Sequence, residues 1–428
     1  MVEDGEGLFT LATLFDDDAM PVCWSFGLGV ESSAGLVRTL LEPGFGPPQL
    51  LADLSNLIVM IAQSGDEWTS TCDLVATHIL PLLAQRRVRL VEVARAGPRV
   101  ADGIVVLQDT RTPTRLHPDA DEHGFYALSA EHRGNGVMPS LGGRACSAKA
   151  KGQPLDAWRA TYLGPRPYVH AVGFNADEIG RIERDTSVRM GGRRHPIYPL
   201  HAANWSRAKC QGYLFGLFGV WWPKSCCRQC CFVNVPSWPD QLARYRAYPD
   251  EAYPNLVDEY CALALNHRSG LFGPGKSLRD RLRADGAYEV HALADAAMDA
   301  GEWAVYRVRR CYSARAQAWR AVEIVHRADR ADAERFVLDR ADAERFVLDL
   351  ADSLKIAVRV DGEHSRLWLT GETEGYPRLE EFFVAAPSTI NPKERSGFEA
   401  RWGGHADERL LALEDAAASR GALARPAA

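Results

Sequence analysis

Residues 21–36 read PVCWSFGLGVESSAGL and pass from an apolar run through two glycines into an amphipathic pattern. The run Pro21–Phe26 predicts a β-strand, and the apolar spacing over Ser32–Leu41 predicts a helix with one buried face. Gly27 and Gly29 lie in the turn between them, and Ser32 can cap the helix or contact a phosphate. A strand, a glycine turn and a helix N-terminus together offer backbone N–H groups to an anion. The stretch therefore indicates an anion-binding site, with a tight βα turn and a serine cap as an equal alternative.

The same alternation of short apolar runs and amphipathic stretches continues over the first 200 residues or so. It predicts strands over Leu57–Ala62, Val88–Val93, Gly103–Leu107 and Tyr168–Phe174, and helices over Thr69–Gln85, Pro154–Leu163 and Ser206–Phe218. Such alternation is typical of an α/β fold with a parallel sheet and helices on both faces. Ligands of these sheets bind beyond the carboxyl ends of the strands. A mostly helical C-terminal region is expected to follow, including Pro239–Trp303.

The chain is therefore expected to have four parts. These are an acidic N-terminal arm (1–19), a nucleotide-binding domain with a cysteine cluster (20–235), a helical extension (236–320) and a charged tail unit (321–428). The tail contains the tandem repeat RADAERFVLD at Arg330–Asp339 and Arg340–Asp349, which we interpret as a local duplication in a charged helix. Ile356–Val360 and Arg366–Thr370 look like strands, so the tail can be a small α+β unit.

Composition and charge narrow the class of protein. The 428 residues are 46% hydrophobic and 25% charged, which excludes a wholly disordered or fibrous chain. A net charge of -6 excludes a globally basic nucleic-acid-binding protein but leaves room for a local basic groove. The acidic first 19 residues do not resemble a secretory signal, and no apolar run approaches the ~20 residues that cross a bilayer. We expect a cytoplasmic protein that does not enter membranes.

The second predicted strand ends in QSGDEWT, residues 63–69. The acidic pair Asp66 and Glu67, after Gly65, suits ribose hydroxyls or a magnesium ion. Trp68 could stack on a base, although a core tryptophan is an equal alternative.

Ten cysteines are present, and four of them lie within Cys226–Cys231. In a reducing compartment such clustering indicates metal or redox chemistry rather than structural disulfides. Cys227 and Cys230 form one C-x-x-C spacing, which is half of a metal site. The isolated cysteines are expected to be buried apolar residues; they are Cys23, Cys72, Cys261 and Cys311.

The motifs GLGVES (27–32) and SGDEW (64–68), in this order, resemble the adenine-nucleotide α-hydrolase superfamily, in particular the PP-loop ATP pyrophosphatases and their phosphoadenosine phosphosulfate (PAPS) reductase branch. The family's loop is Ser-Gly-Gly-x-Asp-Ser; Gly29 and Ser32 match it, and Glu31 stands for the aspartate. GFNADE (173–178) is similar to the branch's Gly-Ile-Arg-Ala-x-Glu. Asn175 replaces the arginine there, so Arg181 or Arg184 would supply the anion contact. The resemblance covers residues 20–235.

The resemblance extends to the cysteines. Lys224, Ser225, Cys227, Cys230 and Phe232 match a Lys-Ser-x-Cys-x-x-Cys-Pro-Phe block of reductase-like relatives, with Cys231 in place of the proline. Cys146 with Lys151 and Pro154 resembles the Cys-Thr-x-x-x-Lys-x-x-Pro stretch of DNA-phosphorothioation-type relatives. It implies a four-thiolate set that would hold a [4Fe–4S] cluster, with zinc as the alternative. The set is Cys146, Cys210, Cys227 and Cys230. Lys149 and Lys151 could reach a phosphate or polarise a leaving group, or be a solvated pair.

The resemblance implies an ATP-dependent adenylylating sulfur-transfer enzyme. It would bind ATP and Mg²⁺, release pyrophosphate and thiolate a nucleic-acid or small-molecule acceptor, with sulfur from a donor protein such as a cysteine desulfurase. One alternative is a sulfonucleotide reductase, although no cysteine follows Cys311 to supply that family's C-terminal nucleophile. The other alternative is a non-catalytic, metal-stabilised nucleotide-binding module.

Overall fold

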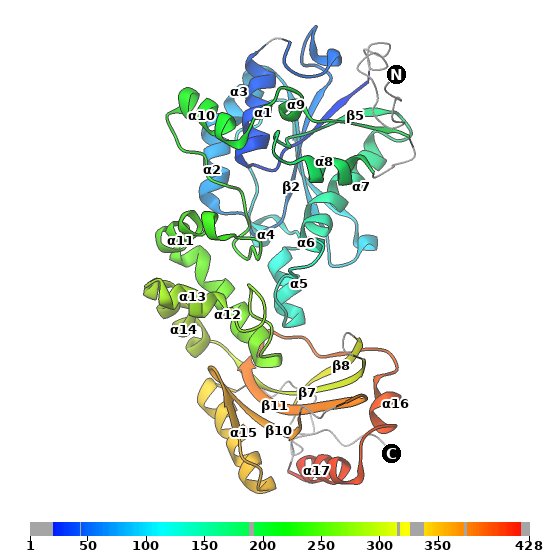
Figure 1. The fold of residues 1–428 in the computed structure, drawn as a ribbon, viewed down its shortest axis with the longest axis vertical. Coiled ribbons are helices and arrows are strands. Elements are labelled where there is room, and N and C mark those ends of the chain that lie inside the picture. Colours follow the sequence, from blue (N-terminus) through cyan, green and yellow to red (C-terminus); the bar gives the residue numbers. More distant parts are fainter. Residues whose placement is uncertain are drawn as a thin grey trace. The chain divides into compact units, whose positions relative to one another are not determined.

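The computed structural model describes residues 20–42, 44–187, 192–314, 317–325, 338–371 and 375–420. The chain divides into two compact units (Figure 1). Unit 1 comprises the residues up to Ser129 together with Gly142–Cys230, and unit 2 comprises Ala130–Leu141 together with the chain from Cys231 onwards. The regions 236–320 and 321–428, which the sequence separates, thus lie in one unit.

Unit 1 is built on a six-stranded sheet, which confirms the predicted α/β class. Its strands are parallel except β4, which runs antiparallel to β3 because only the short stretch 96–103 joins them. The order across the sheet is β4 (Ile104–Thr110), β3 (Arg89–Arg95), β2 (Leu57–Gln63), β1 (Val22–Ser25), β5 (Tyr168–Val172) and β6 (Arg194–Ile197).

Helices cover both faces of this sheet (Figure 1). On one face an apolar core joins Trp24 and Val59 to α1 (Val30–Leu41), α2 (Thr69–His78), α3 (Leu80–Gln85) and α10 (Arg207–Phe218). On the other face Trp158 of α7 (Gln153–Tyr162) packs against Met60 and Val91. The shorter helices are α4 (Ala120–His123), α5 (Leu128–Asn135), α6 (Ala145–Ser147), the π-helical turn η4 (Ala148–Gly152), α8 (Ile179–Thr186) and α9 (Pro199–Ala202).

Unit 2 corrects the expectation of a mostly helical C-terminal region. Four helices do follow unit 1: α11 (Trp238–Ala247), α12 (Pro249–Leu265), α13 (Leu278–Ala284) and α14 (Tyr288–Ala300). They lead into a second six-stranded sheet, which is antiparallel. Its order is β12 (Lys393–Glu394), β8 (Gln317–Ile324), β7 (Trp303–Ala314), β11 (Arg378–Pro387), β10 (His364–Thr370) and β9 (Arg359–Asp361).

The two faces of the second sheet bury different helices. Cys261 and Leu265 of α12 pack against Tyr306 and Phe382 on one face. The other face packs against α15 (Arg340–Leu354), α16 (Phe398–Gly403) and α17 (Glu408–Ser419). The second copy of the tandem repeat opens α15, as predicted, and Asp339 caps that helix by accepting the Asp342 N–H at 2.8 Å. Most of the first copy lies outside the described residues.

Within the described ranges, no helix is both long enough and apolar enough to cross a membrane. The four isolated cysteines are buried, as expected, with exposed fractions of 4% or less.

Candidate functional site

The position of β1 determines which loops meet at the carboxyl edge of the unit 1 sheet. β1 lies between β2 and β5, so the loops that follow β1 and β5 diverge at this edge, which is where ligands of open α/β sheets bind. The two loops also touch. A Cβ on Gly173 would lie 2.7 Å from Ser32 Cα, and Asn175 Nδ2 donates to Glu31 Oε1 at 3.3 Å. Two motifs separated by about 140 residues are thus brought together.

The turn after β1 differs from its predicted form in one respect. α1 begins at Val30, with Gly29 as its N-cap and no side-chain cap. Of the two roles predicted for Ser32, capping is therefore wrong, and contact with a phosphate stays a prediction. Ser32 Oγ instead donates to the Gly29 carbonyl at 3.2 Å. The turn is open beside Gly27, because a Cβ there would come no closer than 4.0 Å to a neighbour. Ser32 and the first N–H groups of α1 are therefore placed to meet an anion at Gly27.

The loop after β2 holds two buried carboxylates, Asp66 and Glu67, which are 2% and 4% exposed. Glu67 forms an ion pair with Lys151 of η4. Asp66 accepts the Ser129 N–H at 2.8 Å and lies 3.6 Å from the Arg228 guanidinium. Both acids are thus largely neutralised by their own chain.

The other residues predicted for this loop have distinct places. Trp68 is 0% exposed, so it is a core residue and its ring is not free to stack on a base. Burial opposes the charge of Lys151, but Glu67 and Cys227 outweigh it and raise the pKa of the lysine. Lys151 is therefore a fixed cation at this edge, whereas Lys149 is exposed.

The segment Trp222–Cys230, which we call the covering segment, links the loops after β1 and β2. The Trp222 indole N–H donates to the Leu28 carbonyl at 3.1 Å, and a Cβ on Gly29 would lie 2.8 Å from Ser225 Oγ. Farther along, Cys227 forms a β-bridge with Glu67, and Arg228 donates to the Gly65 carbonyl at 2.7 Å. The covering segment thereby carries the C-x-x-C motif to the carboxyl edge of the sheet.

The structure brings together two of the four predicted thiolate ligands. Cys227 is hydrogen-bonded to Cys230, and this contact together with burial raises the pKa of the Cys227 thiol well above its usual value. Cys210 lies on α10 and is wholly buried in the apolar core, and Cys146 lies on α6. No group of three potential ligand side chains is assembled in the described part of the chain. The four-thiolate centre therefore stays a prediction.

Arg181, predicted to contact an anion, lies on α8 beside the β5 loop. Its guanidinium stands 4.3 Å from the centre of the Phe174 ring and pairs with Glu178. Arg181 is therefore close to the carboxyl edge of the sheet, but a ligand would compete with Glu178 for its guanidinium.

A serine–histidine contact at the end of β1 is not a nucleophilic pair. Ser25 Oγ lies 2.6 Å from His170 Nε2, while Arg194 Nε donates to His170 Nδ1 at 2.6 Å. Because Nδ1 accepts, the ring proton must be on Nε2, and the histidine donates to the serine. A general base would need the opposite arrangement.

One sequence pattern was missed. Residues 270–277 read GLFGPGKS, which matches the phosphate-loop pattern GxxxxGK[ST]. That pattern binds phosphate after a β-strand, but here the loop follows helix α12. The carboxylate of Glu259, which is 0% exposed, accepts the N–H groups of Leu271, Leu278 and Arg279 at 2.7–2.8 Å. A carboxylate of the chain itself thus occupies the place that a phosphate would take.

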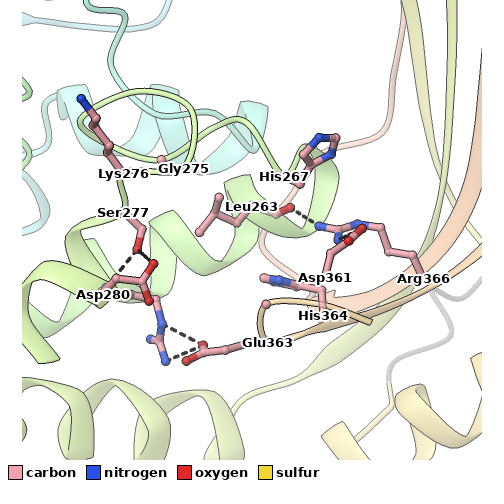
Figure 2. A pocket seen from close by; sticks show the side chains of 13 residues that line it. Leu263, His267, Gly275, Lys276, Ser277, Asp280, Asp361, Glu363, His364 and Arg366 are labelled. Atoms are coloured by element: carbon pink, nitrogen blue, oxygen red, sulfur yellow. Dashed lines mark hydrogen bonds and ion pairs between the residues drawn. The ribbon is translucent and has the colours of Figure 1, made fainter. Parts of the chain in front are cut away.

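Beside this loop lies a cavity of about 210 Å³ in unit 2 (Figure 2). The loop side contributes Lys276 and Ser277, and the turn between β9 and β10 contributes Asp361 and Glu363. The charges are mostly paired, because Arg366 binds Asp361 and Arg279 binds Glu363. This cavity contains none of the residues that the sequence predicted.

Replacing Lys151 with Met would leave the buried Glu67 carboxylate without its cation. Because Lys151 is one-third exposed, we expect the free energy of unfolding to fall by about 2 kcal/mol, below the usual range for breaking a buried pair. Lys149→Met, two residues away, should cost less than about 0.5 kcal/mol. Urea unfolding measures both, and Glu67→Gln should recover part of the loss. Equal losses for the two lysines would contradict the ion pair's importance.

Replacing Glu259 with Gln would remove charge-assisted hydrogen bonds to three N–H groups. We expect the free energy of unfolding of unit 2 to fall by about 3 kcal/mol, because a glutamine offers one acceptor oxygen. The exposed Glu289→Gln is the control and should change it by less than about 0.5 kcal/mol. A Glu259→Gln protein as stable as the parent would show that the carboxylate does not hold the loop.

Comparison of the chain with protein-family models, with curated proteins and with solved structures found no match.

Proposed function

We propose that unit 1 is an adenine-nucleotide-dependent enzyme of the PP-loop and PAPS reductase-like type, which adenylylates an acceptor and prepares it for sulfur transfer. The observation that carries the proposal is the convergence of GLGVES, GFNADE and the C-x-x-C motif at one carboxyl edge of a parallel sheet. These are the motifs on which the resemblance to that superfamily depends.

The groups at this carboxyl edge support the binding of a nucleoside triphosphate. The open side of the turn at Gly27 faces the first N–H groups of α1 and the Ser32 hydroxyl. Lys151, held as a cation by Glu67, adds positive charge at the same edge. Such preorganised donors stabilise charge that develops on a phosphate during transfer, without reorganisation of water.

The proposed reaction has two steps. An oxygen of the acceptor attacks the α-phosphorus of ATP, the bond between the α-phosphorus and the bridging oxygen breaks, and pyrophosphate leaves. A sulfur nucleophile from a donor protein then attacks the activated atom of the acceptor, and AMP leaves with the original oxygen. We assign the arrival of this sulfur to the Cys227–Cys230 pair, because Cys227 forms a β-bridge with Glu67 in the loop after β2.

The described residues fit a magnesium ion better than they fit an iron–sulfur cluster. Glu67 Oε2 is buried and has no hydrogen-bond partner among the described residues, and a carboxylate oxygen is a ligand that Mg²⁺ prefers. Glu67 would hold the ion, which supplies charge neutralisation at the phosphates when bound. The described residues offer two adjacent thiols rather than four, so no step is assigned to an iron–sulfur cluster.

Specific observations bear on the two alternatives. A sulfonucleotide reductase needs a mobile cysteine, yet Cys311, the last cysteine of the chain, is buried within β7 of unit 2. A non-catalytic nucleotide-binding module is favoured by the pairing of Asp66 and Glu67 with cations. Turnover of ATP distinguishes this module from the enzyme.

Ser32→Ala and Glu31→Gln should lower pyrophosphate release from ATP by about 10²-fold or more, because each change removes a group at the phosphate turn. Ser55→Ala is the matched control, since Ser55 is exposed at the opposite, amino edge of the strands. Circular dichroism should show all three proteins folded. Nucleotide binding without turnover in the parent protein would support the module instead.

Anaerobic purification followed by iron, sulfide and zinc analysis tests the cysteine site. A bound metal lost on Cys227→Ala but retained on Cys72→Ala, a buried and isolated cysteine, is the expected result. Zinc without iron would exclude the cluster. A protein that contains neither metal would leave Cys227 and Cys230 as a thiol pair.

A further inference from the structure

The arginines on the two faces of the unit 2 sheet differ in how completely carboxylates pair with them. On the face that packs against α15–α17, Arg307 and Arg309 are almost fully buried and each pairs with at least two carboxylates. The partners of Arg307 are Glu381, Glu323 and Glu414, and those of Arg309 are Glu323 and Glu399. Positive charge on this face is thus fully compensated.

Four of the cations on the opposite face are Arg310, Arg320, Arg378 and Lys393, which we call the cation cluster. Arg366 lies farther along this face and pairs with Asp361. Arg310 of β7 lies directly opposite Arg320 of β8 in the strand register. Among the described residues, Glu380 is the carboxylate that pairs with this cluster, at 3.0 Å from both Arg310 and Arg378. The Tyr312 hydroxyl donates to the same carboxylate at 3.2 Å. Glu380 thus pairs with two of the four cations, and neither Arg320 nor Lys393 has a carboxylate partner among the described residues.

The remaining contacts compensate three of the four cations in part. Arg310 also donates to the Leu265 carbonyl at the C-terminal end of α12, Arg378 lies 4.5 Å from the centre of the Tyr312 ring, and Lys393 donates to the Asn135 carbonyl. The half-buried Arg320 guanidinium has neither a hydrogen bond nor an ion pair within the described ranges. Among the residues that the structure describes, it is the guanidinium of the cluster without a polar partner.

The pKa shifts within the cation cluster agree with this shortage of carboxylates. Burial and then the neighbouring Arg320 and Arg310 lower the pKa of Lys393 to about 8. Burial and Arg310 likewise lower the pKa of Arg320. Like charges placed opposite each other across two strands destabilise a sheet, and folded proteins retain such conflicts chiefly at functional sites.

We propose that the cation cluster is a binding site for a phosphate group, with Arg320 and Lys393 as its donors and with the buried Arg310 adding positive charge. A guanidinium presents two parallel N–H donors to a phosphate, and it keeps its charge at all relevant pH values. The phosphate would belong either to a small phosphate ester or to the backbone of a single-stranded nucleic acid. This site lies in unit 2 and does not rest on the function proposed for unit 1.

The test compares Arg320→Met, which keeps much of the apolar stem, with Arg345→Met on α15. Arg345 is 66% exposed and provides the same change of charge elsewhere in unit 2. In chloride buffer, Arg320→Met should melt no lower than the parent, because repulsion is relieved. A lower melting temperature would show that Arg320 has a structural partner and would overturn the proposal.

Orthophosphate, added at constant ionic strength, is the first probe. It should raise the melting temperature of the parent and of Arg345→Met but not that of Arg320→Met, because a ligand stabilises only a protein that binds it. A fluorescein-labelled single-stranded DNA is the second probe, followed by fluorescence anisotropy over a range of salt concentrations. If the cluster holds a backbone phosphate, Arg320→Met should reduce the salt slope of the binding constant by about 1.

The two probes distinguish the two sources of phosphate. A response to orthophosphate without DNA binding assigns the site to a small phosphate ester. DNA binding that weakens in Arg320→Met, and not in Arg345→Met, assigns it to a nucleic acid. The proposal is wrong if neither probe binds, or if both variants respond as the parent does.

Discussion

The candidate site depends on one constraint, which is that β1 lies between two parallel neighbours reached in opposite directions along the sheet. Right-handed crossovers then place α1 on one face and α7 on the other, so the carboxyl edge between them is left to loops. The groups proposed to act on a nucleotide come from the loops at this edge, from the first turn of α1, from η4 and from the covering segment. Strand order brings these segments to one edge of the sheet.

The strands of unit 1 could be predicted where every residue is buried and apolar. All of β2 is buried, so its sequence is an unbroken apolar run, and the motifs that follow parallel strands must meet at one edge. β6 could not be seen, because its sequence RHPI contains Arg194 and Pro196, and Arg194 is buried only through Asp185 and His170. The predicted ligand role of Cys210 also required this residue to lie on the side of α10 that faces the other cysteines, which the sequence does not determine. Cys210 and Leu214, four residues apart, both face the core.

The prediction of a mostly helical C-terminal region was wrong for an electrostatic reason. β7 contains Arg307, Arg309 and Arg310, which hide its apolar alternation, and the carboxylates that allow their burial lie up to 107 residues away in the sequence. Hydrophobic patterning takes the polarity of each residue separately, whereas the burial of β7 depends on ion pairs between its arginines and distant carboxylates. The GLFGPGKS loop shows the converse. A local pattern was present, but Glu259, outside the pattern, determines what its N–H groups bind.

The short excursion of residues 130–141 into unit 2 has a mechanical consequence. The backbone passes between the units three times, after Ser129, after Leu141 and after Cys230. A single hinge could bend at one connection, but here any rearrangement must satisfy three at once. Two of these connections adjoin the candidate site, because Ser129 binds Asp66 and Cys230 ends the covering segment. The candidate site and unit 2 are therefore consecutive along the backbone at two places.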